Sequence, residues 1–407
     1  MPLRVLWVNQ WDPANPNSGG AERTIEQVGR RLVERGCQLT VISERAGGLP
    51  KFSRYKGIDV FRPTGRYTLR MWALLNLQRL ADPKDFDIVV SDLSKVLPWT
   101  FPSRVRVPTV HFVRHISGKH LIYETPFMMG PVLWCAERFS PRWLQGQHVL
   151  TEAEHTAALL QELGARPGFV HRIPPGVDTS LFAPNPDARS DVPLLLFVGR
   201  LKRYKRVDLA LRAFALVRAS QADVRFIVVG KGDDFERLQG IARKLDLLDS
   251  VEFLGYVADA EIPNLYQKAW VNLQPSAAEG WGLTINEAAA AGTPTVGFAC
   301  GVMPESVGPI NRPYLVESES DKAFAEKVIK CLSDMRHNRF RIESALAAAT
   351  ARRSWERVAD EYVTLFEQVI DKPSAPFNIS VSQSRHSLNQ IFPRHDPTNT
   401  NGMFGGE

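Results

Sequence analysis

Cysteine is scarce in this chain, which argues against two ways of stabilising a protein. The 407 residues contain four cysteines, and no two of them form a CxxC pair: Cys37, Cys135, Cys300 and Cys331. Disulfide frameworks and structural zinc sites use paired, closely spaced cysteines. We therefore expect neither a disulfide framework nor a zinc site, and the composition fits a reducing compartment.

Long apolar runs are absent as well. The first apolar stretch turns polar at Asn9, which is too early for a signal peptide or a membrane-spanning helix. No later run reaches the roughly 20 residues that a spanning helix needs. We expect a cytoplasmic protein, at most peripheral at the inner face of a membrane. The length suggests two or three domains, and 44% hydrophobic residues suffice for their cores.

A large excess of one charge sign is also missing, but the net charge of +6 is uneven. Residues 1–175 contain 23 Lys+Arg and 15 Asp+Glu, or +8, whereas the remainder contains 27 and 29, or −2. A basic first half favours an anionic membrane surface or a phosphate-bearing acceptor, and we expect no nucleic-acid partner. A basic surface that only keeps the protein soluble remains an equal alternative.

The most informative segment is residues 271–296, which read VNLQPSAAEGWGLTINEAAAAGTPTV. The pattern predicts a short strand, a loop of small residues and a helix over 283–291, with Gly292 and Pro294 as stop signals. The start of such a helix directs unpaired backbone N–H groups at whatever lies before it. Gly282, Leu283 and Thr284 are therefore candidates for binding an anion.

Two carboxylates flank this helix start, Glu279 on the loop and Glu287 within the helix. Either one alone would be interpreted as a solvated surface charge. Carboxylates also accept hydrogen bonds from hydroxyl groups, which suits a sugar or a ribose. Their joint occurrence around Glu-Gly-Trp-Gly-Leu and before Gly-Thr-Pro favours the binding interpretation.

At these residues the sequence resembles the retaining glycosyltransferases of family 4, whose signature is Glu, seven residues and Glu in an EGFGL context. Trp281 stands where Phe is usual. The resemblance implies an α/β protein with the GT-B fold, in which two Rossmann-like domains have parallel sheets that face each other across a cleft. It also implies that Glu279 contacts the transferred sugar and Glu287 the ribose of the nucleotide.

A second motif follows the apolar strand predicted at residues 194–198. It reads GRLKRYKRVD and resembles the VGRL…K…D motif of the same family. A nucleoside diphosphate gains charge as its bond to the sugar breaks, and Arg200 and Lys205 can neutralise that charge without a metal. Each group would contribute on the order of 3 kcal/mol to the transition state. The Asp85-Phe86-Asp87 run is interpreted as the start of a strand, and we expect no metal.

The first half begins with a strand, a Gly-containing loop, a helix and a strand, which is typical of a nucleotide-binding sheet. Gly19 and Gly20 allow the backbone to approach a phosphate closely. The resemblance implies that this loop contacts the diphosphate across the cleft. Gly232 follows a later strand, where a nucleobase could lie against the backbone or the chain could simply turn.

His111 lies near the end of a strand predicted at residues 108–113, and the resemblance implies that it faces the transferred sugar. A lone histidine is more often structural, so both interpretations stay open. Residues 51–79 mix basic, aromatic and apolar side chains. They fit a helix lying on an anionic membrane or, as we prefer, a helix packing Met71, Leu74, Leu75 and Leu77 into the core.

The resemblance also implies the domain boundaries. Residues 1–173 would form an acceptor domain and 174–353 a nucleotide-sugar domain. A helix over 354–371 would cross back to the first domain. Residues 372–407 are rich in Ser, Asn and Pro and are expected to be a disordered tail.

Together these motifs predict a retaining glycosyltransferase of cell-envelope or polysaccharide biosynthesis. It would need no cofactor and would move a sugar from a UDP- or GDP-linked donor to a glycan, lipid-linked or other hydroxyl acceptor. No side chain stands out as a nucleophile, so no covalent intermediate is expected. A non-catalytic nucleotide-sugar-binding protein and a same-fold epimerase are the alternatives, although the set Arg200, Lys205, Glu279 and Glu287 is complete.

Overall fold

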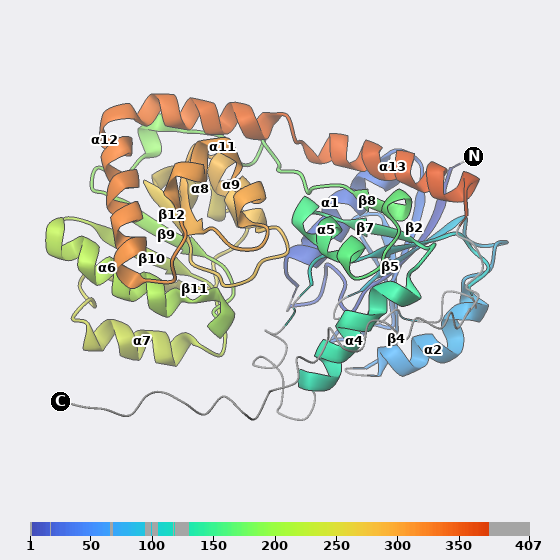
Figure 1. The fold of residues 1–407 in the computed structure, drawn as a ribbon. Coiled ribbons are helices and arrows are strands. Elements are labelled where there is room, and N and C mark those ends of the chain that lie inside the picture. Colours follow the sequence, from blue (N-terminus) through green and yellow to red (C-terminus); the bar gives the residue numbers. More distant parts are fainter. Residues whose placement is uncertain are drawn as a thin grey trace, which may run out of the picture.

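The protein consists of two α/β halves that lie side by side and are joined at the start of the last helix (Figure 1). The computed structural model describes residues 2–16, 18–65, 68–93, 99, 105–116, 118 and 130–373. The expected disordered tail lies outside these residues, apart from Lys372 and Pro373. In the described part of the chain, no helix has the length and apolar character needed to cross a membrane.

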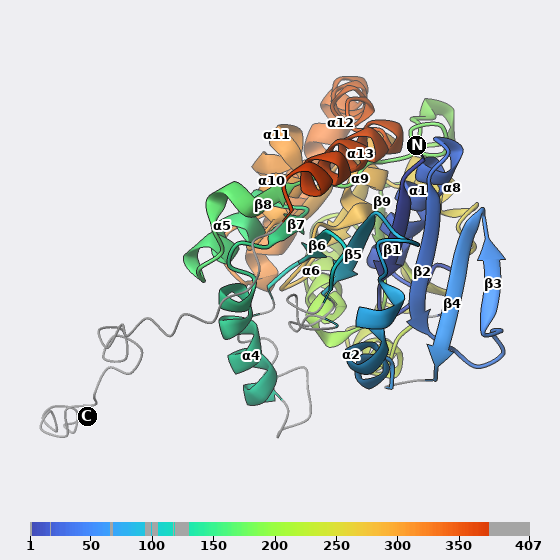
Figure 2. The same ribbon diagram turned by 90° about the vertical axis from the view of Figure 1, so that its right-hand side faces the viewer.

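The first half is built on an eight-stranded sheet in the order β3-β4-β2-β1-β5-β6-β7-β8, in which only β3 runs antiparallel to its neighbour (Figure 2). Its strands are β1 (Arg4–Val8), β2 (Gln38–Glu44), β3 (Phe52–Tyr55), β4 (Ile58–Thr64), β5 (Ile88–Asp92), β6 (Thr109–Phe112), β7 (His148–Thr151) and β8 (Val170–Arg172). Its helices are α1 (Gly20–Glu34), α2 (Leu69–Leu80), α4 (Gly130–Trp143) and α5 (Glu154–Glu162).

The second half contains a six-stranded parallel sheet in the order β11-β10-β9-β12-β13-β14. The strands are β9 (Leu194–Val198), β10 (Arg225–Val229), β11 (Val251–Gly255), β12 (Val271–Gln274), β13 (Thr295–Phe298) and β14 (Leu315–Val316). The helices are α6 (Val207–Ser220), α7 (Phe235–Lys244), α8 (Ile262–Lys268), α9 (Leu283–Ala290), α10 (Met303–Ser306), α11 (Gly308–Asn311) and α12 (Asp321–Ala351).

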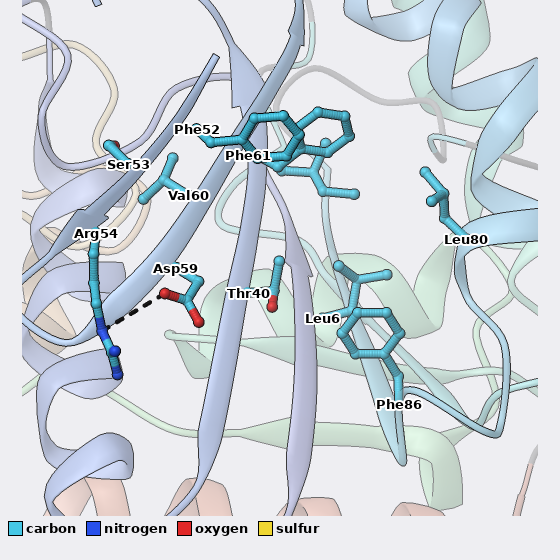
Figure 3. A pocket seen from close by; sticks show the side chains of 11 residues that line it. Leu6, Thr40, Phe52, Ser53, Arg54, Asp59, Val60, Phe61, Leu80 and Phe86 are labelled. Carbon is cyan, nitrogen blue, oxygen red and sulfur yellow. Dashed lines mark ion pairs between the residues drawn. The ribbon is translucent and has the colours of Figure 1, made fainter. Parts of the chain in front are cut away.

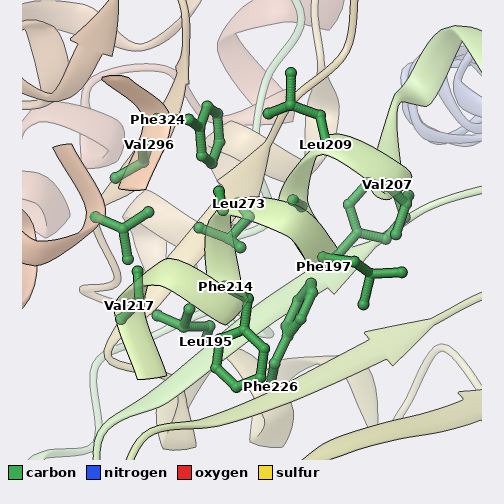
Figure 4. Packing of buried hydrophobic residues seen from close by; sticks show 14 of the residues in the cluster. Leu195, Phe197, Val207, Leu209, Phe214, Val217, Phe226, Leu273, Val296 and Phe324 are labelled. Atoms are coloured by element: carbon green, nitrogen blue, oxygen red, sulfur yellow. The ribbon is translucent and has the colours of Figure 1, made fainter. Parts of the chain in front are cut away.

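Apolar side chains on both faces of each sheet explain why the central strands read as unbroken hydrophobic runs. In the second half, Phe197, Phe214 and Phe226 form the centre of a fully buried cluster between β9, β10 and α6 (Figure 4). In the first half, α1 and the last helix, α13 (Trp355–Asp371), cover one face of the sheet, whereas α2 covers part of the other.

Helix α13 packs against α1 of the first half. Arg31 donates to Glu356 at 2.6 Å, and Arg35 lies 2.8 Å from Asp360. Just before α13, the segment at Gly176 runs alongside the one at Ser354, and the two backbones bond to each other. A β-carbon on Gly176 would lie 2.7 Å from the backbone nitrogen of Trp355, so only glycine fits this crossing.

Three local features differ from the expectations. The sequence predicts helices over residues 323–331 and 340–351, and both segments belong to one helix, α12, which is kinked at Asn338. Strands β3 and β4 form an unexpected hairpin, whose turn residues Lys56 and Gly57 both have positive φ, as tight hairpin turns require.

The third difference concerns α2. The expectation that Met71 and Leu75 pack into the core is wrong, because they are 63% and 62% exposed. The buried residues are Leu69, Ala73 and Leu77, spaced four apart, and this spacing places Met71 and Leu75 on another face of the helix.

Candidate functional site

The central loop and helix are β12, the residues that follow it and α9. Gly282 precedes the helix with φ 84° and ψ 67°, a left-handed conformation that disfavours side chains. A β-carbon on Gly282 would also lie 2.8 Å from Ile285. Glycine therefore sets the direction in which α9 begins, and the first residues of the helix, Leu283 and Thr284, present their backbone N–H groups at its start.

Glu279 is held by hydrogen bonds from Lys205, Gln274 and Ser276. Lys205 Nζ and Gln274 Nε2 both reach Oε1 of Glu279, at 2.5 and 2.6 Å, and the Glu279 side chain is only 9% exposed. Burial would raise the pKa of this carboxyl, but the nearby Lys205 ammonium and the hydrogen bonds outweigh burial, and the pKa lies below its usual range. The sequence-predicted Lys205 and Glu279 thus form an ionised pair.

The loops carrying Lys205 and Glu279 are tied together by their backbones. Lys205 ends a short 3-10 turn, Arg203–Lys205, and is followed by Arg206 in the left-handed region. The amide of Ala277 donates to the carbonyl of Tyr204 at 2.9 Å. This bond fixes the distance between the loop after β9 and the loop after β12.

Glu287 lies on α9 and is buried, with an exposed fraction of 7%. Its Oε1 is 3.5 Å from Nε of Arg23, which belongs to α1 of the other half, and Arg23 also lies 3.8 Å from Asp259. Burial raises the pKa of Glu287, and Arg23 opposes part of that rise. Arg23 is a site residue that the sequence reasoning missed, although it lies within the Gly-Gly-Ala-Glu-Arg run.

The Gly19-Gly20 loop faces the second half. A β-carbon on Gly19 would lie 3.7 Å from Cζ of Arg200, and one on Gly20 would lie 3.7 Å from Cδ1 of Leu283. Glu22 fixes the loop by accepting from the amide of Gly19 at 2.7 Å. The structure therefore brings the glycine loop, the exposed Arg200 and the start of α9 together across the interface between the halves.

The packing of the neighbouring backbone requires a glycine at position 232. A β-carbon there would lie 1.9 Å from the carbonyl oxygen of Leu201, which no side chain can tolerate. The close approach joins the loops after β9 and β10. A contact between Gly232 and a nucleobase stays a prediction.

Among the described residues, no contact links His111 to Glu279. It is 2% exposed on β6, neither ring nitrogen has a hydrogen-bond partner among the described residues, and burial lowers its pKa to about 4. His115, past the end of the strand, is closer to the site: a β-carbon on Gly280 would lie 3.8 Å from its Nδ1. The role of His111 stays a prediction.

Arg114 supports this edge of the first half. It lies 2.7 Å from Asp92 and 2.9 Å from Glu152, and it donates to the carbonyl of Ala21 at 3.3 Å. Burial would lower the pKa of Arg114, but the two carboxylates outweigh burial and raise it. The Arg114 guanidinium joins the ends of β5, β6 and β7 to the first turn of α1. These bonds thereby hold the glycine loop in place.

The segment at 300–305 contacts the first half through Glu305. Its carboxylate accepts from the amide of Glu154 at 2.8 Å and from Arg172 at 3.0 Å. In the same segment, Sγ of Cys300 lies 3.6 Å from the carbonyl oxygen of Ala277. Glu305 and Arg23 are thus two polar bridges between the halves.

Among the described residues, no cluster of three or more His, Cys, Asp or Glu side chains could hold a metal ion. Asp87 of the Asp-Phe-Asp run pairs instead with Arg4 at 2.7 Å, at the amino ends of β1 and β5.

Comparisons with known proteins bear on the family and the fold of this chain. Residues 18–181 match the model of glycosyltransferase family 4, and residues 181–346 match that of glycosyl transferases group 1. Two curated relatives are D-inositol 3-phosphate glycosyltransferases. The protein of Stackebrandtia nassauensis is 26% identical over 91% of this chain and 93% of its own, and that of Geodermatophilus obscurus is 27% identical over 89% and 88%.

Solved structures show the same fold at low sequence identity. Sucrose-phosphate synthase from Thermosynechococcus elongatus has a TM-score of 0.74 at 20% identity, covering 91% of this chain and 99% of its own. The Anabaena protein HepE, solved with UDP and glucose, has a TM-score of 0.68 at 19% identity, covering 90% and 100%. WaaG, a glycosyltransferase involved in lipopolysaccharide biosynthesis, has a TM-score of 0.71 at 19% identity, covering 89% and 99%.

Proposed function

Because the chain belongs to the group 1 glycosyltransferases and has the GT-B fold, we propose that it transfers a sugar from a nucleotide-sugar donor with retention of configuration and without a metal. The observation that carries this proposal is the meeting of Arg200, the Lys205–Glu279 pair and the glycine loop at the start of α9. These groups match the charges and hydroxyls of a nucleoside diphosphate sugar.

In this proposal the diphosphate lies before α9. Arg200 and Lys205 supply positive charge, while the N–H groups of α9 and the glycine loop supply hydrogen bonds. All of these groups are in place before the reaction begins, so they stabilise the charge that develops on the leaving diphosphate.

The two carboxylates hold the neutral parts of the donor. Glu279 is ionised and accepts hydrogen bonds from the sugar hydroxyls, which orients the sugar carbon toward the acceptor. Glu287, in the middle of α9 and next to Arg23, holds the ribose hydroxyls.

The transfer step breaks the bond between the sugar carbon and the diphosphate oxygen while the acceptor oxygen bonds to the same carbon. Attack occurs on the face from which the diphosphate leaves, and the hydroxyl proton of the acceptor passes to a departing phosphate oxygen. No protein nucleophile is required, in keeping with the paired state of Glu279, which accepts from the amide of Gln274 at the end of β12.

The proposed donor is UDP- or GDP-linked, and the HepE complex with UDP favours UDP. The proposed acceptor is a glycan, lipid-linked or other hydroxyl compound of cell-envelope or polysaccharide biosynthesis, presented by the first half. The relatives named for D-inositol 3-phosphate make a phosphorylated polyol a natural first acceptor to test. The proposal places the protein in the cytoplasm, in peripheral contact with the inner face of a membrane.

The first experiment measures UDP and GDP release from a set of nucleotide sugars, with and without acceptor, in the presence of EDTA. Glu279→Ala and Lys205→Ala should each lower release by about 10²-fold or more. Lys202→Ala is the matched control, because Lys202 lies on the same loop but pairs at the surface with Asp233. The anomeric configuration of the product, determined by NMR, tests retention.

Other results would favour the alternatives. Donor binding without release, unchanged in the Glu279 and Lys205 variants, would favour a nucleotide-sugar-binding protein. Formation of a new nucleotide sugar without any acceptor would favour an epimerase. Activity that EDTA abolishes and magnesium restores would contradict metal independence.

A further inference from the structure

A cavity of about 600 Å³ lies in the first half, bounded by β1, β2, the β3–β4 hairpin and the end of α2 (Figure 3). Most of its wall is apolar and includes Leu6, Phe61 and Phe86. None of the residues that line it takes part in the contacts around Glu279. The cavity is therefore separate from the proposed donor site, whereas a buried amide at the end of β12 bears on that site directly.

This amide belongs to Gln274, the last residue of the otherwise short and buried strand β12, and it is only 1% exposed. Burying an amide without hydrogen bonds costs free energy, so a glutamine at this position needs partners. Its Nε2 donates to Oε1 of Glu279 at 2.6 Å and to Oγ of Ser276 at 3.3 Å, and its Oε1 accepts from Oγ1 of Thr284 at 3.4 Å. The Gln274 side chain thus connects the loop after β12 with the first turn of α9.

The neighbouring strand makes room for this arrangement. Gly297 of β13 pairs with Gln274 in the sheet. A β-carbon on Gly297 would lie 2.9 Å from the carbonyl oxygen of Gln274 and 3.6 Å from its side chain, and would press on the end of β12. Glycine on β13 therefore preserves the position from which the Gln274 amide reaches Glu279.

The two donors to Oε1 of Glu279 leave its other oxygen for a ligand. Lys205 and Gln274 both donate to Oε1, and a carboxylate oxygen has two lone pairs, so these two bonds fill it. A sugar hydroxyl that bonds to Glu279 must then do so through Oε2. The charged Lys205 can also turn toward a diphosphate, whereas the neutral Gln274 amide gains most by staying on the carboxylate.

We propose that Gln274 is a positioning residue for sugar transfer, which holds Glu279 by Oε1 and so directs Oε2 at a hydroxyl of the donor sugar. The bond from Thr284 orients the Gln274 amide, and the same side chain sets the distance between Glu279 and the helix start that receives the diphosphate. The inference rests on the proposed function, and it assigns no direct contact between Gln274 and the donor.

The charge of Glu279 provides a readout of this role. Burial raises the pKa of Glu279, and three hydrogen-bond donors act against burial: Lys205, Ser276 and Gln274. Cys300 lies beside the same loop, where burial and, to a smaller extent, the charges of Glu319 and Glu279 raise the pKa of its thiol. His115 of the first half lies toward the neighbouring Gly280. Because Gln274 does not titrate, replacing it changes the pKa of Glu279 without removing a charge.

Gln274→Met keeps the size of the side chain and removes its hydrogen bonds. Donor turnover should show a kcat about tenfold lower or less, because a hydrogen bond to a charged group is lost. The acid limb of the pH profile should move to higher pH, since Glu279 binds a proton more readily without this donor. The affinity for UDP alone should stay unchanged, because UDP has no sugar for Glu279 to bind.

Asn272→Leu is the matched control. Asn272 is a second buried amide on β12, but its Nδ2 donates to Thr295 of β13 at 3.1 Å, away from Glu279. This variant should keep the kcat and the pH profile of wild type. Unfolding temperatures establish that each variant is folded before its turnover is compared.

Gln274→Glu has nearly the same shape and should reverse the pH response. At low pH the introduced carboxyl is protonated and donates to Glu279, whereas at higher pH it ionises and the two carboxylates repel each other. Turnover of this variant should therefore be closest to wild type at low pH and fall as pH rises, the opposite of Gln274→Met. A purely structural role of Gln274 predicts the same fractional loss at every pH in both variants.

A measurement without donor separates this inference from the proposed function. In protein labelled with ¹³C at the glutamate carboxyl carbon, an NMR titration assigned with Glu279→Gln follows the protonation of Glu279. A higher pKa of Glu279 in Gln274→Met than in wild type and Asn272→Leu supports the role. An unchanged pKa, or turnover losses that are equal in Gln274→Met and Asn272→Leu, would overturn it. Absence of nucleotide release by wild type is instead a failure of the proposed function.

Discussion

Arg23 of the first half faces two carboxylates of the second half, Glu287 and Asp259. It lies 3.5 Å from Glu287, and its charge, with a smaller contribution from Tyr266, opposes the rise in the pKa of Glu287 caused by burial. Asp259, which raises that pKa, and Tyr266 are the other titratable groups that act on Glu287. An ionised Glu287 accepts two hydroxyl hydrogen bonds, whereas a protonated one accepts less well.

Arg23→Gln should therefore raise the pKa of Glu287 further. The acid limb of kcat/KM for the donor should move to higher pH, and KM at neutral pH should rise by about tenfold. The measurement is a pH profile of donor turnover. Arg30→Gln, which disrupts only a surface pair with Glu34 on the same helix, should leave the profile unchanged. An identical acid limb in the Arg23 variant would contradict this role.

The two histidines at the end of β6 should behave differently. His111 is buried without a described hydrogen-bond partner, and its pKa of about 4 lies below that of the unfolded chain. The unfolded state therefore binds a proton more tightly between about pH 6.5 and 4, and stability falls as pH falls through that window. The loss attributable to His111 reaches roughly 3 kcal/mol.

His111→Phe should reduce this acid destabilisation and retain donor turnover, whereas His115→Ala should lower turnover and leave stability nearly unchanged. Thermal unfolding at pH 5 and pH 8, together with nucleotide release, checks both expectations. His171, whose pKa is also lowered to about 4, remains as a second source of acid destabilisation. A turnover loss confined to His111→Phe would support the role that the family resemblance implies for His111.

At the level of elements, α9 depends on the glycine before it. Gly282→Ala places a side chain at φ 84° and within 2.8 Å of Ile285, so the helix start must shift. The left-handed strain costs about 1–2 kcal/mol, and the shift should raise KM for the donor. Gly240→Ala is the control, since no atom lies within 4 Å of its added carbon and α7 should gain slightly in stability. Unfolding temperature and donor titration distinguish the two variants.

Elements with local signals could be predicted from the sequence. Residues 271–296 contain a glycine at the helix start, a glycine at the helix end and a proline beyond it. These local signals are enough to predict the strand, the loop and the helix. Helix α2 has no such local signals for its buried face, because its apolar residues occur on more than one side. Only the packing on β1 and β2 determines that Leu69, Ala73 and Leu77 are buried. The same argument explains why Met71 and Leu75 were misassigned.

At the scale of the molecule, contacts between distant residues complete the site, and no local pattern encodes them. Lys205 and Glu279 were predictable because each lies in a dense motif. Arg23 was missed because its partner is 264 positions away, and Arg114 because its role arises only when three strand ends meet. Sequence motifs thus predicted the groups of the second half and the Gly19-Gly20 loop of the first, whereas the contacts of Arg23 and Arg114 emerged from the fold.

The relative position of the halves yields a last prediction. Glu305 accepts hydrogen bonds from the amide of Glu154, in the first turn of α5, and from Arg172. These bonds connect the two halves independently of Arg23. Glu305→Ala removes an anion that complements the positive end of a helix, which is typically worth about 0.3–1 kcal/mol at a surface. A shift of that size changes the ratio of closed to open forms by roughly two- to fivefold.

The Glu305 variant should therefore show a larger radius of gyration by small-angle X-ray scattering and a higher KM for the donor. Its kcat should change little once donor saturates the site, because the groups around Glu279 are intact. Glu252→Ala, an exposed carboxylate on β11, is the control. If scattering and KM match wild type, Glu305 is a surface contact only, and Arg23 with the packing of α13 on α1 must hold the halves together.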